Sequence, residues 1–271
     1  MAGQRTTLTV SIFLLAAILL AACATVPITG RKQLSLIPDS EMNAMSFQQY
    51  DQVIAESQLS TDPEATAMIK RVGGRIQGAV EKYFRDNGMI KHLDGYAWEF
   101  NLIESDQVNA WCMPGGKVAF YTGILPICQD DTGVAVVMGH EIAHAIAEHG
   151  GERMSHQLAV QMGGIALSEA VKSQPEQTQA LYLGAFAVGS HYGAMLPYSR
   201  KHESEADHMG LNMMAMAGYD PRKAPAFWER MSAGGGAPPE FMSTHPSDET
   251  RIRQLNEHMP EAMEYYRANQ Q

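Results

Sequence analysis

Two histidines and a glutamate have the types and the spacing of a metal-dependent hydrolytic site. His140 and His144 lie four residues apart in His140-Glu141-Ile142-Ala143-His144, so on a helix both imidazoles project from one face. That spacing suits two nitrogen ligands of one tetrahedral zinc ion, and Glu141 can take a proton from a zinc-activated water. The alternative is a pair of hydrogen-bonded core histidines. Because the flanking residues are apolar, these polar groups need buried partners, which a metal supplies. We therefore predict one zinc ion per chain as the cofactor.

A downstream segment offers the third ligand that a catalytic zinc requires. In Ser199-Arg200-Lys201-His202-Glu203-Ser204-Glu205-Ala206-Asp207, Glu203 and Asp207 have i, i+4 spacing and share a helix face. We expect Glu203 to ligate the metal and Asp207 to accept the outer N–H of a ligand histidine. We expect Glu205 to point away into solvent. The alternative for this segment by itself is a solvated charged face.

The metzincin pattern is excluded because Ala147 and Gly150 stand where its glycine and third histidine would be. His149 follows His144 by five residues, half a turn off the ligand face. We expect it at the surface or beside the ligands.

The elements that position these residues indicate a helix-rich α+β fold with a small sheet. Alternating residues predict strands at about 98–102 and 117–121. We expect the strand at 117–121 to be the edge strand that flanks the active helix, where an extended peptide can pair with it. Its alternative role is plain sheet structure. Apolar periodicity, caps and breakers predict helices at about 39–57, 62–80, 132–148, 199–217, 220–231 and from 247 onward, with one or two more between 156 and 198 broken near 173–175.

The N-terminus predicts export. An apolar run over 8–20 follows one positive charge and ends in Leu20-Ala21-Ala22-Cys23, which resembles the lipobox of bacterial lipoproteins. We expect residues 1–22 to be a signal peptide, 23–40 a tether lipidated at Cys23, and 41–271 a single metallopeptidase domain. The alternative is an ordinary signal peptide with an incidental cysteine. Ala24 in place of an aspartate favours the outer membrane, facing the periplasm.

Two cysteines remain beyond Cys23. In an oxidising compartment Cys112 and Cys128 can form one disulfide, or they can be two buried free thiols. The sequence leaves both open. The chain of 271 residues carries a formal net charge of −10, so we expect no nucleic-acid partner, because such binding needs a basic surface.

Several motifs together make the chain resemble a known family. The sequence is similar to the gluzincin family of the type I CAAX prenyl proteases, HtpX and the mitochondrial Oma-type proteases, and within it to the periplasmic lipoproteins LoiP and BepA. The motifs are Pro27 to Leu34, Asn109 to Gly116, His140 to His144, Ser199 to Asp207, Thr244-His245-Pro246 and Arg251-Ile252.

The resemblance implies zinc on His140, His144 and Glu203, with Glu141 as general base. It also implies that His245 and Arg251 approach the site and stabilise the developing oxyanion. In BepA-like members the histidine at the His245 position can cap the zinc as a self-inhibiting fourth ligand. The chain ends at Gln271, so we expect no helical repeat domain of the BepA kind.

The residues predict hydrolysis, and the resemblance predicts the setting. We expect a zinc endopeptidase that cleaves unfolded or misassembled envelope proteins, with outer-membrane assembly machinery as a partner. One alternative is a zinc-stabilised chaperone or assembly factor that does not cut. Another is a non-peptidic zinc hydrolase.

Overall fold

The computed structural model describes residues 23–191, 195–233, 245 and 250–270, so the expected signal peptide lies outside the described residues. The contacts within the chain divide it into two compact units. One combines residues up to 39 with 150–196, and the other combines 40–149 with 197–271. The boundaries at 22/23 and 40/41 and the single domain over 41–271 stay predictions.

The larger unit is built on a three-stranded sheet with the order β3-β5-β4. Strand β3 (Glu99–Ile103) runs parallel to β5 (Lys117–Tyr121), and β4 (Ala110–Met113) pairs with β5 antiparallel. The prediction that 117–121 is the edge strand was therefore wrong, because β5 is paired on both sides. The edge strand that contacts the active helix is β4. It escaped prediction because Ala-Trp-Cys-Met is short and lacks alternation.

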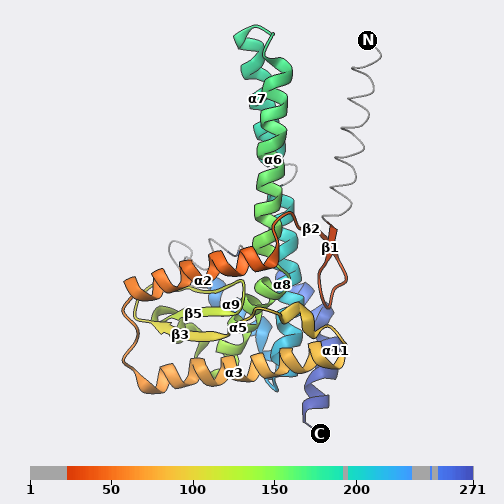
Figure 1. Ribbon diagram of the computed structural model, residues 1–271. Helices are drawn as coiled ribbons and strands as arrows, with labels where there is room; N and C mark the ends of the chain where they lie inside the picture. Colours follow the sequence, from red (N-terminus) through yellow and green to blue (C-terminus); the bar gives the residue numbers. More distant parts are fainter. Residues whose placement is uncertain (1–22, 192–194, 234–244, 246–249, 271) are drawn as a thin grey trace. The chain divides into compact units, whose positions relative to one another are not determined.

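Two long helices hold this sheet (Figure 1). Helix α2 (Asp39–Glu56) carries Tyr50, whose hydroxyl donates to the Val118 carbonyl of β5. Helix α3 (Pro63–Asp86) begins at Asp62, whose side chain accepts two backbone N–H groups of the first turn. Its predicted apolar stripe is buried, and Gly73 lies directly against Phe100 of β3.

Helix α5 (Asp131–Ile146) is buried over almost its whole length and carries the His-Glu-x-x-His motif. It begins at Asp130, whose side chain accepts the Gly133 N–H. It ends slightly before the predicted residue 148, and no glycine ends it. Glu148 makes the turn with a φ of 57°, and Gly150 and Gly151 lie in the first turn of the next helix, α6 (His149–Val171).

The remaining described elements of the larger unit are mostly helical. Helix α8 (Leu196–Met216) ends before Gly218, whose φ of +84° favours glycine. The predicted helix at 220–231 is a short 3₁₀ turn followed by α9. The other bounds are η1 (Ile90–Leu93), η2 (Thr122–Ile124), α4 (Leu125–Cys128), η4 (Pro221–Lys223), α9 (Ala224–Ser232) and α11 (Arg251–Asn269).

The smaller unit contains a strand pair and a helical hairpin. Strands β1 (Cys23–Thr25) and β2 (Lys32–Leu34) pair antiparallel within the expected tether, and Cys23 is exposed. Helix α6 runs beside α7 (Glu176–Ser190) after the predicted break near 173–175 (Figure 1). No helix among the described residues is both long and apolar enough to cross a membrane. Apolar side chains exposed on the two helices include Leu158, Met162, Ile165, Leu181 and Val188.

Candidate metal centre

Four side chains converge in the larger unit. They are His140 and His144 of α5, Glu203 of α8, and His245. The Nε2 atoms of His140 and His144 lie 3.1 Å apart. Each Nε2 is also 3.4 Å from one Glu203 carboxylate oxygen. Two nitrogen ligands about 2.05 Å from a tetrahedral zinc would be separated by about 3.3 Å, so the spacing fits one ion.

The protonation of these atoms also fits a cation. Because His140 Nδ1 lies 2.9 Å from Asp207 Oδ1, Nδ1 carries a proton, and Nε2, which faces Glu203, is the nitrogen available to a metal ion. Burial holds the pKa of His144 well below its usual value, so that imidazole is neutral. Burial opposes ionisation of Glu203, but hydrogen bonds with His140 and His245 hold its pKa far below normal. The two Nε2 atoms and the Glu203 carboxylate therefore face one another, and a metal ion bound between them would satisfy all three groups.

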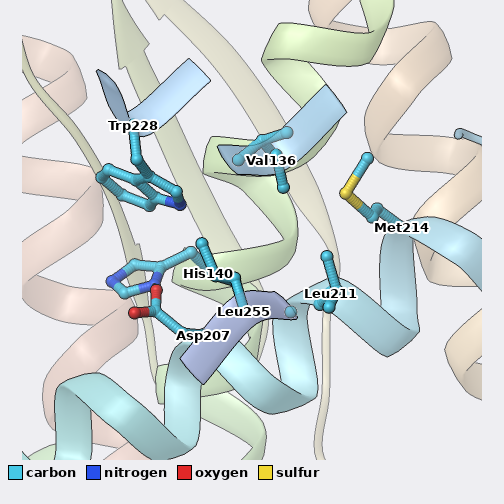
Figure 2. A pocket seen from close by; sticks show the side chains of 9 residues that line it. Val136, His140, Asp207, Leu211, Met214, Trp228 and Leu255 are labelled. Carbon is cyan, nitrogen blue, oxygen red and sulfur yellow. The ribbon is translucent and has the colours of Figure 1, made fainter. Parts of the chain in front are cut away.

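The Asp207 carboxylate lies beside the imidazole of His140, with Oδ1 2.9 Å from Nδ1. Figure 2 shows it beside the His140 ring at the edge of a small, mostly apolar pocket, with Trp228 on another side of the imidazole. Burial by itself would lower the pKa of His140, but hydrogen bonds to Asp207 and Glu203 outweigh it and raise the pKa to about 9. The surroundings of His140 therefore stabilise positive charge.

A chain of hydrogen bonds positions the second histidine. His144 Nδ1 lies 2.8 Å from His149 Nδ1, and His149 Nε2 lies 3.0 Å from Glu205 Oε2. With His144 Nε2 on the metal, each imidazole donates outward and Glu205 accepts at the end of the chain. The prediction that Glu205 is solvated was wrong, because Glu205 is buried against His149. The position of His149 beside a ligand agrees with one of the two expected placements.

Glu141 is almost completely buried at 3% exposure. Burial raises the pKa of its carboxyl group, and a hydrogen bond from the backbone N–H of Cys112 on β4 opposes this rise. Its Oε1 meets no hydrogen-bond donor within the described part of the chain. His245 Nε2 lies 3.6 Å from this oxygen. A buried carboxylate with a free oxygen beside a metal cluster suits a general base.

Arg251 connects the carboxylates of α8. Its Nε donates to Asp207 at 2.6 Å and its Nη2 donates to Glu203 at 3.0 Å. The guanidinium is buried and lies 4.0 Å from the centre of the Trp228 ring. Arg251 therefore approaches the site, as the resemblance implied, through contacts with a ligand and with the partner of a ligand.

His245 occupies a position among the ligands. Its Nδ1 lies 3.3 Å from His140 Nε2 and 3.2 Å from Glu203 Oε1. All four ligand atoms of the cluster lie within 4.8 Å of one another. A fourth donor atom, the third nitrogen of the cluster, is therefore available where a metal would otherwise bind water or substrate.

The two remaining cysteines are free thiols, and no disulfide joins them. Burial and the charge of Glu141 raise the pKa of Cys112. Burial also raises the pKa of Cys128, whose charged neighbours are Arg230 and Asp130. The two side chains therefore lie in different surroundings.

Three contributors to the site carried no usable sequence signal. The backbone N–H of Cys112 is invisible to a reading of side chains, and Trp228 reads as an ordinary core residue of an apolar helix. Glu205 lies two residues from Glu203, off its helix face. Its burial depends on His149, which is 56 residues away in the sequence and 3.0 Å away in the structure.

Comparisons with known proteins agree with this geometry. The sequence profile of peptidase family M48 matches residues 71–259. The mitochondrial metalloendopeptidase OMA1 of Schizosaccharomyces pombe is 33% identical over 243 residues, which cover 88% of this chain and 66% of the relative. OMA1 of Arabidopsis thaliana is 37% identical over 196 residues, covering 71% of this chain and 38% of the relative. The beta-barrel assembly-enhancing protease of Escherichia coli is 26% identical over 210 residues, which cover 74% of this chain and 40% of the relative. The chain thus spans two thirds or less of the length of these relatives.

Proposed function

The chain belongs to peptidase family M48, and from this membership we propose that it is a zinc endopeptidase that hydrolyses internal peptide bonds of unfolded proteins. The observation that carries the proposal is the buried Glu141, whose free Oε1 lies beside the His140, His144 and Glu203 cluster. A pure metal-binding site has no use for a buried carboxylate that neither ligates the metal nor orients a ligand.

His140, His144 and Glu203 hold the zinc, which when bound supplies Lewis acidity toward water and the peptide carbonyl. Glu141 accepts a proton from the attacking water on Oε1 and passes it to the leaving amine. Its raised pKa suits both steps, because a base that is too weak would not take the proton. Cys112 holds the other side of the carboxylate through its backbone N–H.

Asp207 and the His149–Glu205 pair orient the two ligand histidines from behind. We assign Arg251 a positioning role, because two of its nitrogens already bind Asp207 and Glu203. The resemblance implied instead that Arg251 stabilises the developing oxyanion. His245 is a fourth donor that holds the site in a closed resting state when no substrate is present.

The substrate is an extended peptide that pairs with β4. This strand is an edge of the sheet, and it contacts both α5 and, through Cys112, the general base. Main-chain pairing requires an unfolded segment, which favours unfolded or misassembled proteins as substrates. The resemblance described above likewise implied unfolded or misassembled envelope proteins as substrates, which would make the protein part of envelope protein quality control.

The setting is the outer membrane, facing the periplasm, with Cys23 lipidated and outer-membrane assembly machinery nearby. The lipobox-like sequence before Cys23 supports the lipid anchor, and Cys23 is exposed at the start of β1. Labelling with a radioactive fatty acid tests it: the wild type should be labelled in the membrane fraction and Cys23→Ala should not. An unlabelled wild type would reject the anchor without touching the hydrolytic proposal.

Glu141→Gln tests the hydrolysis. The variant should keep its zinc, and its cleavage of an unfolded test protein should fall about 10²–10⁴-fold. Glu264→Gln, a change of the same kind on the last helix, is the control. Undiminished cleavage by Glu141→Gln would reject Glu141 as the base.

A zinc-stabilised chaperone is the second candidate, and the exposed apolar side chains of α6 and α7 favour it. It predicts that the zinc-loaded wild type binds an unfolded protein and suppresses its aggregation without cleaving it. Cleavage that depends on Glu141 would reject a purely non-proteolytic role.

A further inference from the structure

A second group of potential metal ligands lies outside the candidate catalytic centre. It consists of His208 on α8 and of His258 and Glu261 on α11. One ligand atom from each residue lies within 4.8 Å of the others. None of the three belongs to the His140, His144, Glu203 and His245 cluster.

The Glu261 carboxylate is held in place from both sides. Asn212 Nδ2 donates to its Oε1 at 2.8 Å, and His208 Nε2 lies 2.7 Å from its Oε2. Asn212 is fully buried and fixes the orientation of the carboxylate, as the hydrogen-bonding partners of metal ligands do. The second oxygen therefore faces the two histidines.

The two imidazoles stack with their centroids 3.8 Å apart and their planes 13° apart. Two stacked rings so close repel each other when both are protonated. Burial, together with the charge of His208, lowers the pKa of His258. A neutral imidazole is the form that binds metals. The His208 and Glu261 side chains are 19% and 42% exposed, so an ion can enter from solvent and keep water ligands.

We propose that His208, His258 and Glu261 bind a second divalent transition-metal ion, with zinc as the ion we would test first. Two imidazole nitrogens and one carboxylate oxygen are a donor set that zinc takes readily. The alternative is that His208 and Glu261 form only a hydrogen bond between helices.

The second ion would connect the helix that carries the candidate ligand Glu203 and its neighbour Asp207 to the helix that carries Arg251. Helix α8 bears Glu203 and Asp207, and α11 begins with Arg251. Polar contacts already join the two helices at three points: Arg251 with Asp207, Ser204 with Gln254, and His208 with Glu261. A metal at His208 and His258 would stabilise the packing of α8 against α11. It is therefore a structural site that supports the candidate catalytic zinc site.

Metal counting tests the proposal on the full chain, purified without a histidine tag, stripped with a chelator and reloaded with zinc. Bound zinc is measured by elemental analysis after gel filtration. We expect two ions in the wild type, one in His144→Ala, one in His258→Ala and none in the double variant. His191→Ala, which removes an exposed histidine outside both clusters, should keep two.

A thermal melt in the His144→Ala background gives a readout that does not depend on activity. Zinc should raise its melting temperature, because an ion that binds only the folded state stabilises it. Adding Glu261→Gln, which keeps the shape of the side chain, should abolish this rise. If His258→Ala does not fold, Glu261→Gln takes its place in the metal count. A His144→Ala protein that binds no zinc, or a count indifferent to both His258→Ala and Glu261→Gln, would overturn the second site.

Discussion

Gly139 of α5 and Gly210 of α8 lie so close that a side chain on either would collide with the backbone of the other helix. A Cβ on Gly210 would stand 2.7 Å from the backbone nitrogen of His140, and one on Gly139 would stand 2.7 Å from the Gly210 carbonyl oxygen. Gly139 immediately precedes His140, and Gly210 follows Asp207 by three residues. This close approach brings the histidines of one helix to the carboxylates of the other.

Gly210→Ala should therefore push α8 away from α5. We expect a loss of about 1–3 kcal/mol in the free energy of unfolding, the usual effect of overpacking a core, together with weaker zinc binding. Urea denaturation and competition with a chromogenic chelator measure the two effects. Gly74→Ala on α3 is the control, because nothing lies within 4 Å of its Cβ position. It should be neutral or stabilising by up to about 1 kcal/mol. A Gly210→Ala protein as stable as the wild type would show that the two helices can separate freely.

His245→Ala should speed cleavage of a short quenched peptide by the zinc-loaded protein. The reason is that His245 Nδ1 lies within 3.3 Å of both His140 Nε2 and Glu203, where substrate or water would bind. Steady-state kinetics of the variant and of the control His191→Ala measure the change. A tenfold or greater fall in kcat would instead make His245 a catalytic group that stabilises the oxyanion.

His149→Gln should weaken zinc binding about 10–100-fold, since partners that orient a ligand histidine contribute about that much. Glu205→Gln should act through the same hydrogen-bond chain, so the double variant should lose less than the sum of the single losses. Chelator competition measures all three affinities, with His156→Gln on the same helix as the control. Strictly additive losses would show that Glu205 does not act through His149.

Arg251→Met should destabilise the fold by about 3–5 kcal/mol, because it leaves the buried Asp207 and Glu203 carboxylates without their shared cation. Arg251→Lys should recover part of this, since an ammonium cannot reproduce both guanidinium contacts. Arg253→Met is the control, and its exposed pair with Glu257 predicts a change within about 0.5 kcal/mol. Urea denaturation compares the three variants. Equal stability of Arg251→Met and Arg253→Met would remove the proposed positioning role.

Features that depend on neighbours within one helix were predictable. Helical spacing places His140 and His144 on one face whatever the rest of the chain does, and the same spacing joins Glu203 to Asp207. Local caps and breakers likewise predicted the start of α3 at Asp62 and the break between α6 and α7. The sequence therefore predicted a zinc ion, its three candidate ligands and the helix-rich α+β class; the structure confirms the class and brings the three candidate side chains together.

Features that depend on segments far apart in the chain were decided only by tertiary structure. Strand order is one, because pairing with both β3 and β4 makes β5 central and leaves β4 beside Glu141. Another is the burial of Glu205, which we predicted in solvent and which the fold packs against His149, 56 residues away in the sequence. The meeting of His208 with His258 and Glu261 is a third. In each case the deciding contribution is burial between elements, which a local pattern of residues does not encode.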